Sequence, residues 1–112
     1  MSQLTTSSKK IATVLTEYAR RFSRNEAGSA LLEQVVQLLP QTTDPEEFRT
    51  IAPHLWDEYF CVDAEVMIQV LRRWLEIEPS SKEAKRVLGS YLLAHGPDWD
   101  DEGTRLLAEA SS

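Results

Sequence analysis

The segment 66–93, VMIQVLRRWLEIEPSSKEAKRVLGSYLL, constrains the fold of this chain more than any other part of the sequence. Its first half has the spacing of an amphipathic helix that stops at Glu78-Pro79, because proline cannot continue a helix. A Ser-Ser link follows, and the second half is another amphipathic helix, which carries Leu88-Gly89. A helix stop, a short link and a small residue on the next helix predict two closely packed antiparallel helices.

Apolar residues recur at intervals of three and four along the rest of the chain, and no stretch shows sustained alternation with period two. The sequence therefore predicts an all-α fold of about six helices, arranged as three stacked antiparallel hairpins. Asn25, Asp44 and Asp63 are expected N-caps, together with Ser80 or Ser81, because short polar side chains accept the free N–H groups of a first helical turn. The helices are expected at about 8–23, 27–39, 45–60, 64–78, 81–94 and 98–110.

The length of 112 residues suits one domain that buries a core without disulfides or metals. We expect residues 1–7 to form a disordered tail and residues 8–110 to form a single domain. The apolar runs are far shorter than the roughly 18 residues that a membrane helix needs. The first ten residues also lack the apolar segment of a secretory signal. The expected location is therefore the cytoplasm, with no membrane contact.

The net charge of -6 opposes binding to phosphate backbones, which depends on clustered Lys and Arg, so nucleic acid is not an expected partner. No Gly-rich phosphate loop, nucleophile elbow or Cys-x-x-Cys motif occurs. We therefore expect a protein that is not an enzyme and has no cofactor. His54, Asp57 and Glu58 offer a two-ligand surface site at most, and established metal sites use three or four ligands, so no metal is expected.

The residues 75–79, followed by Leu88-Gly89, resemble the junction between two tetratricopeptide (TPR) repeats. In that family an acid-Pro pair closes the second helix of one repeat, and a Leu-Gly pair on the next helix lets neighbouring helices approach closely. A second acid-Pro pair, Asp44-Pro45, begins 34 residues before Glu78-Pro79, which matches the ~34-residue TPR period. The resemblance covers about residues 45–110 and implies a short right-handed superhelix. The first hairpin is then either a true repeat or a helical cap.

In the TPR family the first helix of each repeat lines a concave groove, so the resemblance implies a groove built from the expected third and fifth helices. Trp, Tyr and Arg are the residue types that most often anchor interfaces. The two arginines suit a partner with acidic groups or a free carboxylate. The alternative for the two aromatic residues is a place in the core. The expected groove residues are Arg49, Trp56, Tyr59, Arg86 and Ser90, with Ala52, Phe60, Glu83 and Leu93 beside them.

These observations favour a small non-catalytic module of the adaptor or scaffold type, which binds a protein or a peptide. The alternative is a homo-oligomeric structural or regulatory protein that associates through its C-terminal helix. Leu106, Leu107 and Ala110 would then be left uncovered on that helix and would meet a second copy of the chain. The size of the protein in solution discriminates between the two functions.

Overall fold

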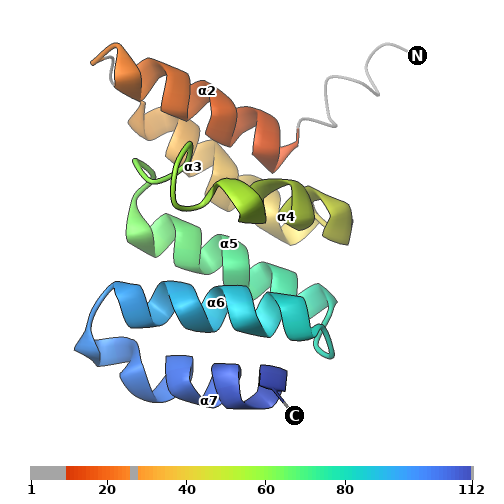
Figure 1. Cartoon of the computed structure of the whole chain (residues 1–112). Helices are drawn as coiled ribbons and strands as arrows, with labels where there is room; N and C mark the ends of the chain where they lie inside the picture. The colour runs from red at the N-terminus through yellow and green to blue at the C-terminus, as the bar shows by residue number, and fades with distance from the viewer. Residues whose placement is uncertain (1–9, 26–27, 112) are drawn as a thin grey trace. The chain divides into compact units, whose positions relative to one another are not determined.

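The computed structural model describes residues 10–25 and 28–111, and within them every regular element is helical, which confirms the predicted all-α fold. The expected disordered tail, residues 1–7, lies outside the described residues. Short 3₁₀ turns cover Leu39–Gln41, Ala52–His54 and Pro97–Trp99. The six α-helices of the described chain (Figure 1) are α2 (Ile11–Ser23), α3 (Ser29–Leu38), α4 (Pro45–Ile51), α5 (Ala64–Ile77), α6 (Lys82–Ala94) and α7 (Asp100–Ser111).

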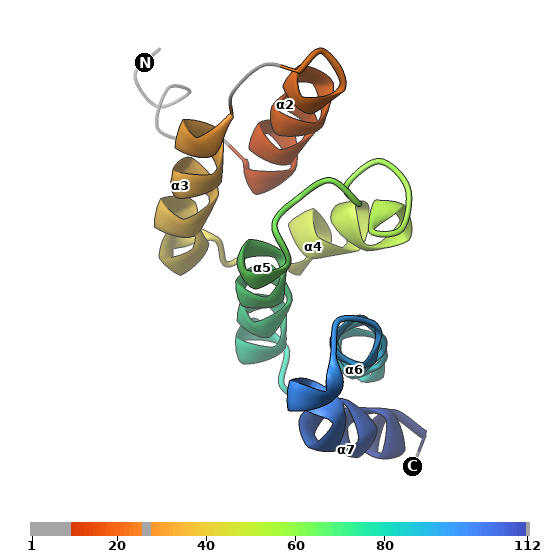
Figure 2. The same cartoon turned by 90° about the vertical axis from the view of Figure 1, so that its left-hand side faces the viewer.

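The chain divides into two compact units, Met1–Val62 and Asp63–Ser112. In the first unit, α2 packs against both α3 and α4. In the second unit, α6 packs against both α5 and α7, and Figure 2 shows α6 nearly end-on with α7 beside it. The helices of each pair α2–α3, α5–α6 and α6–α7 run in opposite directions (Figure 1). The single domain expected over residues 8–110 and the handedness of a superhelix stay predictions.

The first unit is held together by apolar side chains from all of its helices and from the segment after α4. Asp44 is the N-cap of α4, as expected, and its carboxylate accepts the Glu46 N–H at 3.0 Å. The Glu47 carboxylate does not close a capping box on its own helix and instead accepts the Ile11 N–H at 3.2 Å. It thereby satisfies a free donor at the start of α2. The buried side chains are Ile11, Val14, Leu15, Leu31, Val35, Leu39, Phe48, Ile51, Leu55, Tyr59 and Val62.

The third expected helix is shorter than predicted, because α4 ends at Ile51 instead of continuing to about Phe60. Pro53 explains the difference, since proline has no N–H to donate to a carbonyl of the preceding turn. A 3₁₀ turn covers Ala52–His54, and successive turns follow until Asp63. Trp56 and Tyr59 therefore lie on a non-helical segment, residues 55–61.

The expected N-cap Asn25 is wrong, because this residue follows α2 and does not begin α3. Asn25 has φ of 59°, and its N–H donates to the Phe22 carbonyl at 3.0 Å. Asparagine is one of the few non-glycine residues that adopt this left-handed conformation after a helix. Gly28 is the N-cap of α3, and a Cβ there would lie 2.8 Å from the Tyr18 ring.

The second unit begins with the expected cap, since the Asp63 carboxylate accepts the Glu65 N–H at 2.8 Å. The Ser81 hydroxyl accepts the Ala84 N–H at 3.0 Å and so caps α6, which confirms that N-cap. Val66 and Leu75 on α5 are only half-buried, whereas Met67 and Ile68 are buried. The buried face of α5 is formed by Met67, Ile68, Val70, Leu71 and Trp74.

Two glycines allow α6 and α7 to approach closely. A Cβ added at Gly89 would lie 2.9 Å from the Gly103 carbonyl oxygen, and a Cβ at Gly103 would lie 3.0 Å from the Gly89 carbonyl oxygen. The close approach expected at Gly89 is therefore present, with Gly103 as its partner. Leu106 is 2% exposed, so it is not left uncovered on the last helix.

Candidate functional site

One face of α6 carries a line of exposed residues that includes two of the predicted groove residues. Arg86 and Ser90 are exposed, and Leu93 is 37% exposed. Positions spaced by four and three residues share one helix face, so the three side chains form a continuous row, here called the α6 stripe. The buried side of the same helix holds Ala84, Leu88, Tyr91 and Leu92. Arg86 and Ser90 therefore lie opposite the buried face of α6. Leu93, although partly exposed, also lies against α7, since its Cγ is 2.9 Å from where a Cβ of Gly103 would be.

Arg86 differs from every other arginine of the described residues in having no ion pair, hydrogen bond or ring contact. The others pair with a carboxylate in the same unit or make a further contact. Ser90, one turn along, likewise has no side-chain partner among the residues that the structure describes. A guanidinium presents five N–H donors, and those of Arg86 are directed to solvent. The α6 stripe can therefore donate to an anionic group without first breaking an internal contact.

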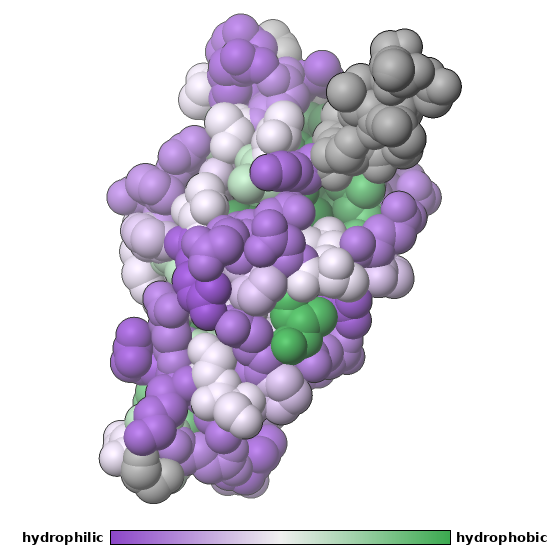
Figure 3. Space-filling view, turned by 90° about the vertical axis from the view of Figure 1, so that its right-hand side faces the viewer, coloured by the Kyte–Doolittle hydropathy of each residue, from purple (hydrophilic) through white to green (hydrophobic). Residues whose placement is uncertain are grey.

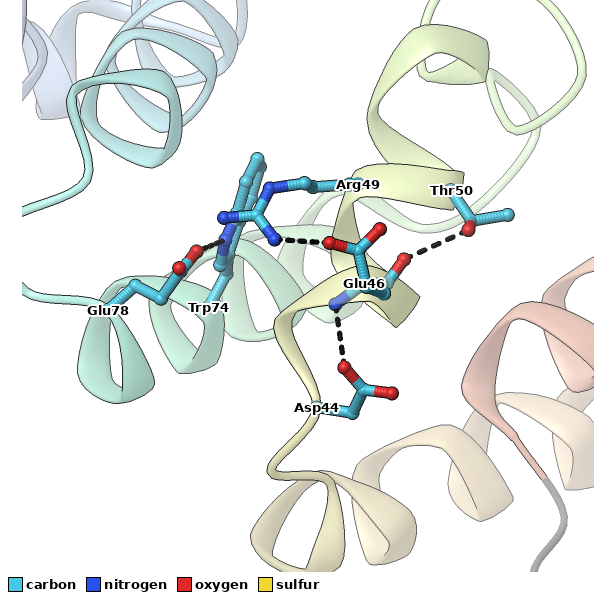
Figure 4. Close-up of polar contacts among 6 residues, drawn as sticks. All are labelled: Asp44, Glu46, Arg49, Thr50, Trp74 and Glu78. Carbon is cyan, nitrogen blue, oxygen red and sulfur yellow. Dashed lines mark hydrogen bonds and ion pairs between the residues drawn. The ribbon is translucent and has the colours of Figure 1, made fainter.

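Arg49, the other predicted arginine, has a different setting on α4 (Figure 4). Its Nη1 lies 2.6 Å from Oε2 of Glu46, and its side chain is about one-third exposed. Glu46 is fixed in turn, because its N–H donates to Asp44 and its carbonyl accepts from the Thr50 hydroxyl at 2.9 Å. A ligand must therefore compete with Glu46 for the Arg49 guanidinium.

The predicted aromatic residues separate into one exposed and one buried side chain. Trp56 is 51% exposed and its neighbour Phe60 is 66% exposed. Tyr59 is only 4% exposed, and its hydroxyl lies 2.9 Å from the Thr16 hydroxyl of α2. Burial is the main cause that raises the pKa of Tyr59 above its usual value. Tyr59 therefore belongs to the core, as the alternative prediction had it, whereas Trp56 is accessible to solvent.

The five predicted residues thus fall on different units. Arg49, Trp56 and Tyr59 belong to Met1–Val62, and Arg86 and Ser90 belong to Asp63–Ser112. Within its unit, the structure brings Arg86 and Ser90 onto one exposed face. A single groove made of all five residues stays a prediction.

An open hollow of about 390 Å³ lies on the first unit, between α2 and residues Thr50 and Tyr59. Its wall combines hydroxyl groups and one charged pair with apolar atoms, which form the larger part of it. We call it the α2 hollow, and it is lined by Ala12, Thr13, Thr16, Glu17, Arg20, Thr50 and Tyr59. No motif in the sequence predicted this hollow. The available signal is the spacing of Thr13, Thr16 and Arg20, which places three polar side chains on one face of a helix whose other face is buried.

The groups that could support chemistry are few in the described ranges. His54 Nδ1 lies 3.6 Å from Oδ1 of Asp57 and 3.9 Å from Oε1 of Glu58. No cluster of three or more His, Cys, Asp or Glu side chains suited to a metal ion occurs in the part of the chain that is described. Burial raises the pKa of the Cys61 thiol, so a smaller fraction of it is the nucleophilic thiolate.

The molecular surface is mainly polar on the face drawn in Figure 3, where hydrophobic residues occupy small separate areas. Large apolar patches are typical of extensive docking interfaces. The described residues on this face therefore form no broad apolar area. Among the described helices, none is long and apolar enough to cross a membrane.

Comparison with known proteins returned no matching family model, no matching curated protein and no matching solved structure. The tetratricopeptide resemblance therefore stays a prediction.

Proposed function

We propose that the chain is a small non-catalytic module that binds a partner protein or peptide carrying acidic groups, and that the α6 stripe is its contact surface. The observation that carries the proposal is Arg86, the arginine without an internal partner among the described residues. It stands one turn from the exposed Ser90 hydroxyl and near the exposed Leu93. The TPR resemblance supports the same surface, because it assigns this helix to the groove.

The α6 stripe offers three kinds of contact in a row. Arg86 can form charge-assisted hydrogen bonds with a carboxylate, Ser90 can donate to a backbone carbonyl, and Leu93 can cover an apolar side chain. The row runs from Arg86 to Leu93, seven helical steps apart, which is about 10 Å at 1.5 Å per residue. An extended peptide covers that length with about three residues. The expected ligand is therefore a short segment with an acidic residue near an apolar one.

Selection of a random peptide library on the full chain tests this proposal. We expect the selected peptides to be enriched in Asp and Glu. They should bind the Arg86→Glu protein about tenfold or more weakly than the original protein, since charge reversal replaces an attraction by a repulsion. Arg105→Gln is the matched control, because Arg105 is an exposed cation of the same unit that pairs with Glu109. Equal affinity for the Arg86→Glu protein and the control would refute the α6 stripe as the contact surface.

The alternative is self-association through the C-terminal helix, and the packing of that helix gives it less support. Leu106 is buried, and both Leu106 and Leu107 lie against the position where Gly89 would carry a Cβ. Ala110 is half-buried. Sedimentation equilibrium over a range of concentrations distinguishes the two functions, since a stable dimer that Leu107→Asp dissociates would favour the alternative.

A further inference from the structure

The turns that follow α4 carry two large aromatic side chains on the protein surface, next to two carboxylates. Trp56 is 51% exposed and Phe60 is 66% exposed, and Asp57 and Glu58 lie between them in the sequence. We call these four residues the 56–60 surface, and we propose that it binds an arginine-containing segment of a partner protein. It lies on the first unit and is negatively charged, whereas the α6 stripe lies on the second unit and is positively charged.

Buried neighbours fix the backbone of the 56–60 surface. Leu55 is 2% exposed and Tyr59 is 4% exposed, and the Tyr59 hydroxyl is hydrogen-bonded to α2. The Phe60 N–H donates to the Asp57 carbonyl at 3.3 Å, which closes a turn. A surface held in this way loses less conformational entropy on binding than a free loop would. The exposed rings are therefore suited to anchor an interface.

The two carboxylates present acceptor oxygens to solvent. Oδ1 of Asp57 accepts the Glu58 N–H and lies 3.6 Å from Nδ1 of His54, and Oε1 of Glu58 lies 3.9 Å from the same nitrogen. The other oxygens, Oδ2 of Asp57 and Oε2 of Glu58, have no contact among the residues that the structure describes. The side chains are 71% and 42% exposed, so a ligand that donates hydrogen bonds can reach both oxygens.

Charge selects a cation at the 56–60 surface. Residues 50–71 contain no Lys or Arg, so no neighbour along the chain offsets the two carboxylates except a protonated His54. Arg20 and Arg49, on α2 and α4 of the same unit, pair with carboxylates elsewhere. An anionic ligand would be repelled, and a purely apolar ligand would bury the carboxylates without hydrogen bonds, which is costly.

Arginine suits both parts of the 56–60 surface at once. Its guanidinium is planar, so it can stack on an aromatic ring while its N–H groups donate to a carboxylate. Trp has the aromatic ring that attracts a cation most strongly. Trp56 and Asp57 are consecutive residues, so one arginine can reach the ring and the carboxylate together. The ammonium of lysine can pair with the carboxylate but has no planar face to stack.

The experiment is a nuclear magnetic resonance titration of the full chain at constant ionic strength with three Gly-Ser peptides. The peptides are identical except at two positions, which hold arginine, lysine or citrulline, a neutral residue with the shape of arginine. The arginine peptide should give saturable shifts at the Trp56 indole and the amides of residues 56–60, with an affinity near the millimolar range because the contacts are exposed. The lysine peptide should bind about threefold more weakly, and the citrulline peptide about tenfold more weakly.

Three variants locate the binding. Asp57→Asn should weaken binding of the arginine peptide by about threefold, since it removes the charge but keeps an oxygen that can accept the Glu58 N–H. Trp56→Leu should also weaken it by about threefold, since leucine is apolar but has no aromatic face. Glu33→Gln is the control, because it removes an exposed carboxylate of the same unit outside the 56–60 surface, and it should change binding by less than about 1.5-fold.

Several results would overturn the proposal. One is an arginine peptide that binds no better than the citrulline peptide, and another is a lysine peptide that binds as tightly as the arginine peptide. Equal weakening by Asp57→Asn and Glu33→Gln would indicate diffuse attraction to an acidic chain. Unchanged binding by a folded Trp56→Leu protein would exclude the aromatic contact.

Discussion

Gly89 and Gly103 are the residues that set the distance between α6 and α7. Each glycine faces the carbonyl oxygen of the other, so neither position has room for a methyl group. The Leu-Gly pair made Gly89 recognisable in the sequence, because a small residue on a helix with an apolar face often marks a close helix contact. Gly103 gave no such signal, since it follows an acidic run and its partner lies on another helix. The contact itself depends on tertiary packing.

Gly89→Ala should destabilise the protein by about 1 kcal/mol in urea unfolding. Alanine favours a helix over glycine by up to about 1 kcal/mol, but its methyl group would lie 2.9 Å from the Gly103 oxygen and 3.3 Å from Leu106 Cβ. Overpacking of this kind typically costs about 1–3 kcal/mol. Ser90→Ala is the control at the exposed neighbouring position and should stay within about 0.5 kcal/mol of the original. An alanine variant at Gly89 as stable as the original would argue against the close contact.

Tyr91 should make the protein less stable at alkaline pH. Burial, with a smaller effect of the Asp63 charge, raises the pKa of Tyr91 to about 12. The phenol of an unfolded chain titrates near pH 10. The protonated phenol therefore contributes stability that is complete below about pH 10 and is lost as pH rises towards about 12.

The pH dependence of urea unfolding for the original and Tyr91→Phe proteins checks this prediction. The difference between their free energies of unfolding should be constant below about pH 10 and then shift by roughly 2 kcal/mol against the original protein by about pH 12. Lysines titrate in both proteins and cancel in the comparison. Parallel curves throughout would contradict a raised Tyr91 pKa.

At the scale of elements, the segment 55–61 shows how one proline changes the presentation of side chains. α4 ends at Ile51, and the following turns bury Leu55 and Tyr59 while leaving Trp56 and Phe60 exposed. The burial of Leu55 and Tyr59 could be predicted from the sequence, because the two residues are spaced as in the apolar stripe of a helix. The helix boundary was also readable, since Pro53 lies inside the expected helix, yet the apolar spacing suggested a helix to Phe60.

The Tyr59–Thr16 hydrogen bond should connect segment 55–61 to α2. Tyr59→Phe and Thr16→Val each remove one hydroxyl of the pair. In a double-mutant cycle of unfolding free energies, the coupling between the two sites should be about 0.5–1.5 kcal/mol, the usual net value of one hydrogen bond. Purely additive effects would show that the two hydroxyls do not interact in solution.

Three helix starts could be predicted from their capping residues. Asp44, Asp63 and Ser81 act as N-caps where the sequence places them, because a capping side chain bonds to N–H groups two or three residues along the same chain. Glu47 shows the limit of such local reasoning. Its carboxylate also caps a helix, but that helix is α2, 36 residues away in the sequence.

For the molecule as a whole, charge decides which surfaces are available to a partner. The chain carries a net charge of -6, and the arginines of the described residues, with the exception of Arg86, are engaged within it. The sequence could indicate Arg86 and Ser90 as groove residues through the resemblance and the helical spacing. The sequence could not show that Arg49 pairs with Glu46, because that contact depends on the rotamers that two flexible side chains adopt.

We propose that the α6 stripe binds an acidic peptide. Amide chemical-shift mapping of the full chain with a peptide selected from the random library tests it most directly. We expect the largest shifts on residues 86–93 of α6. Arg86→Glu should abolish them while the spectrum otherwise stays that of the folded protein. Saturable shifts centred on other helices, or unchanged binding by the Arg86→Glu protein, would contradict it.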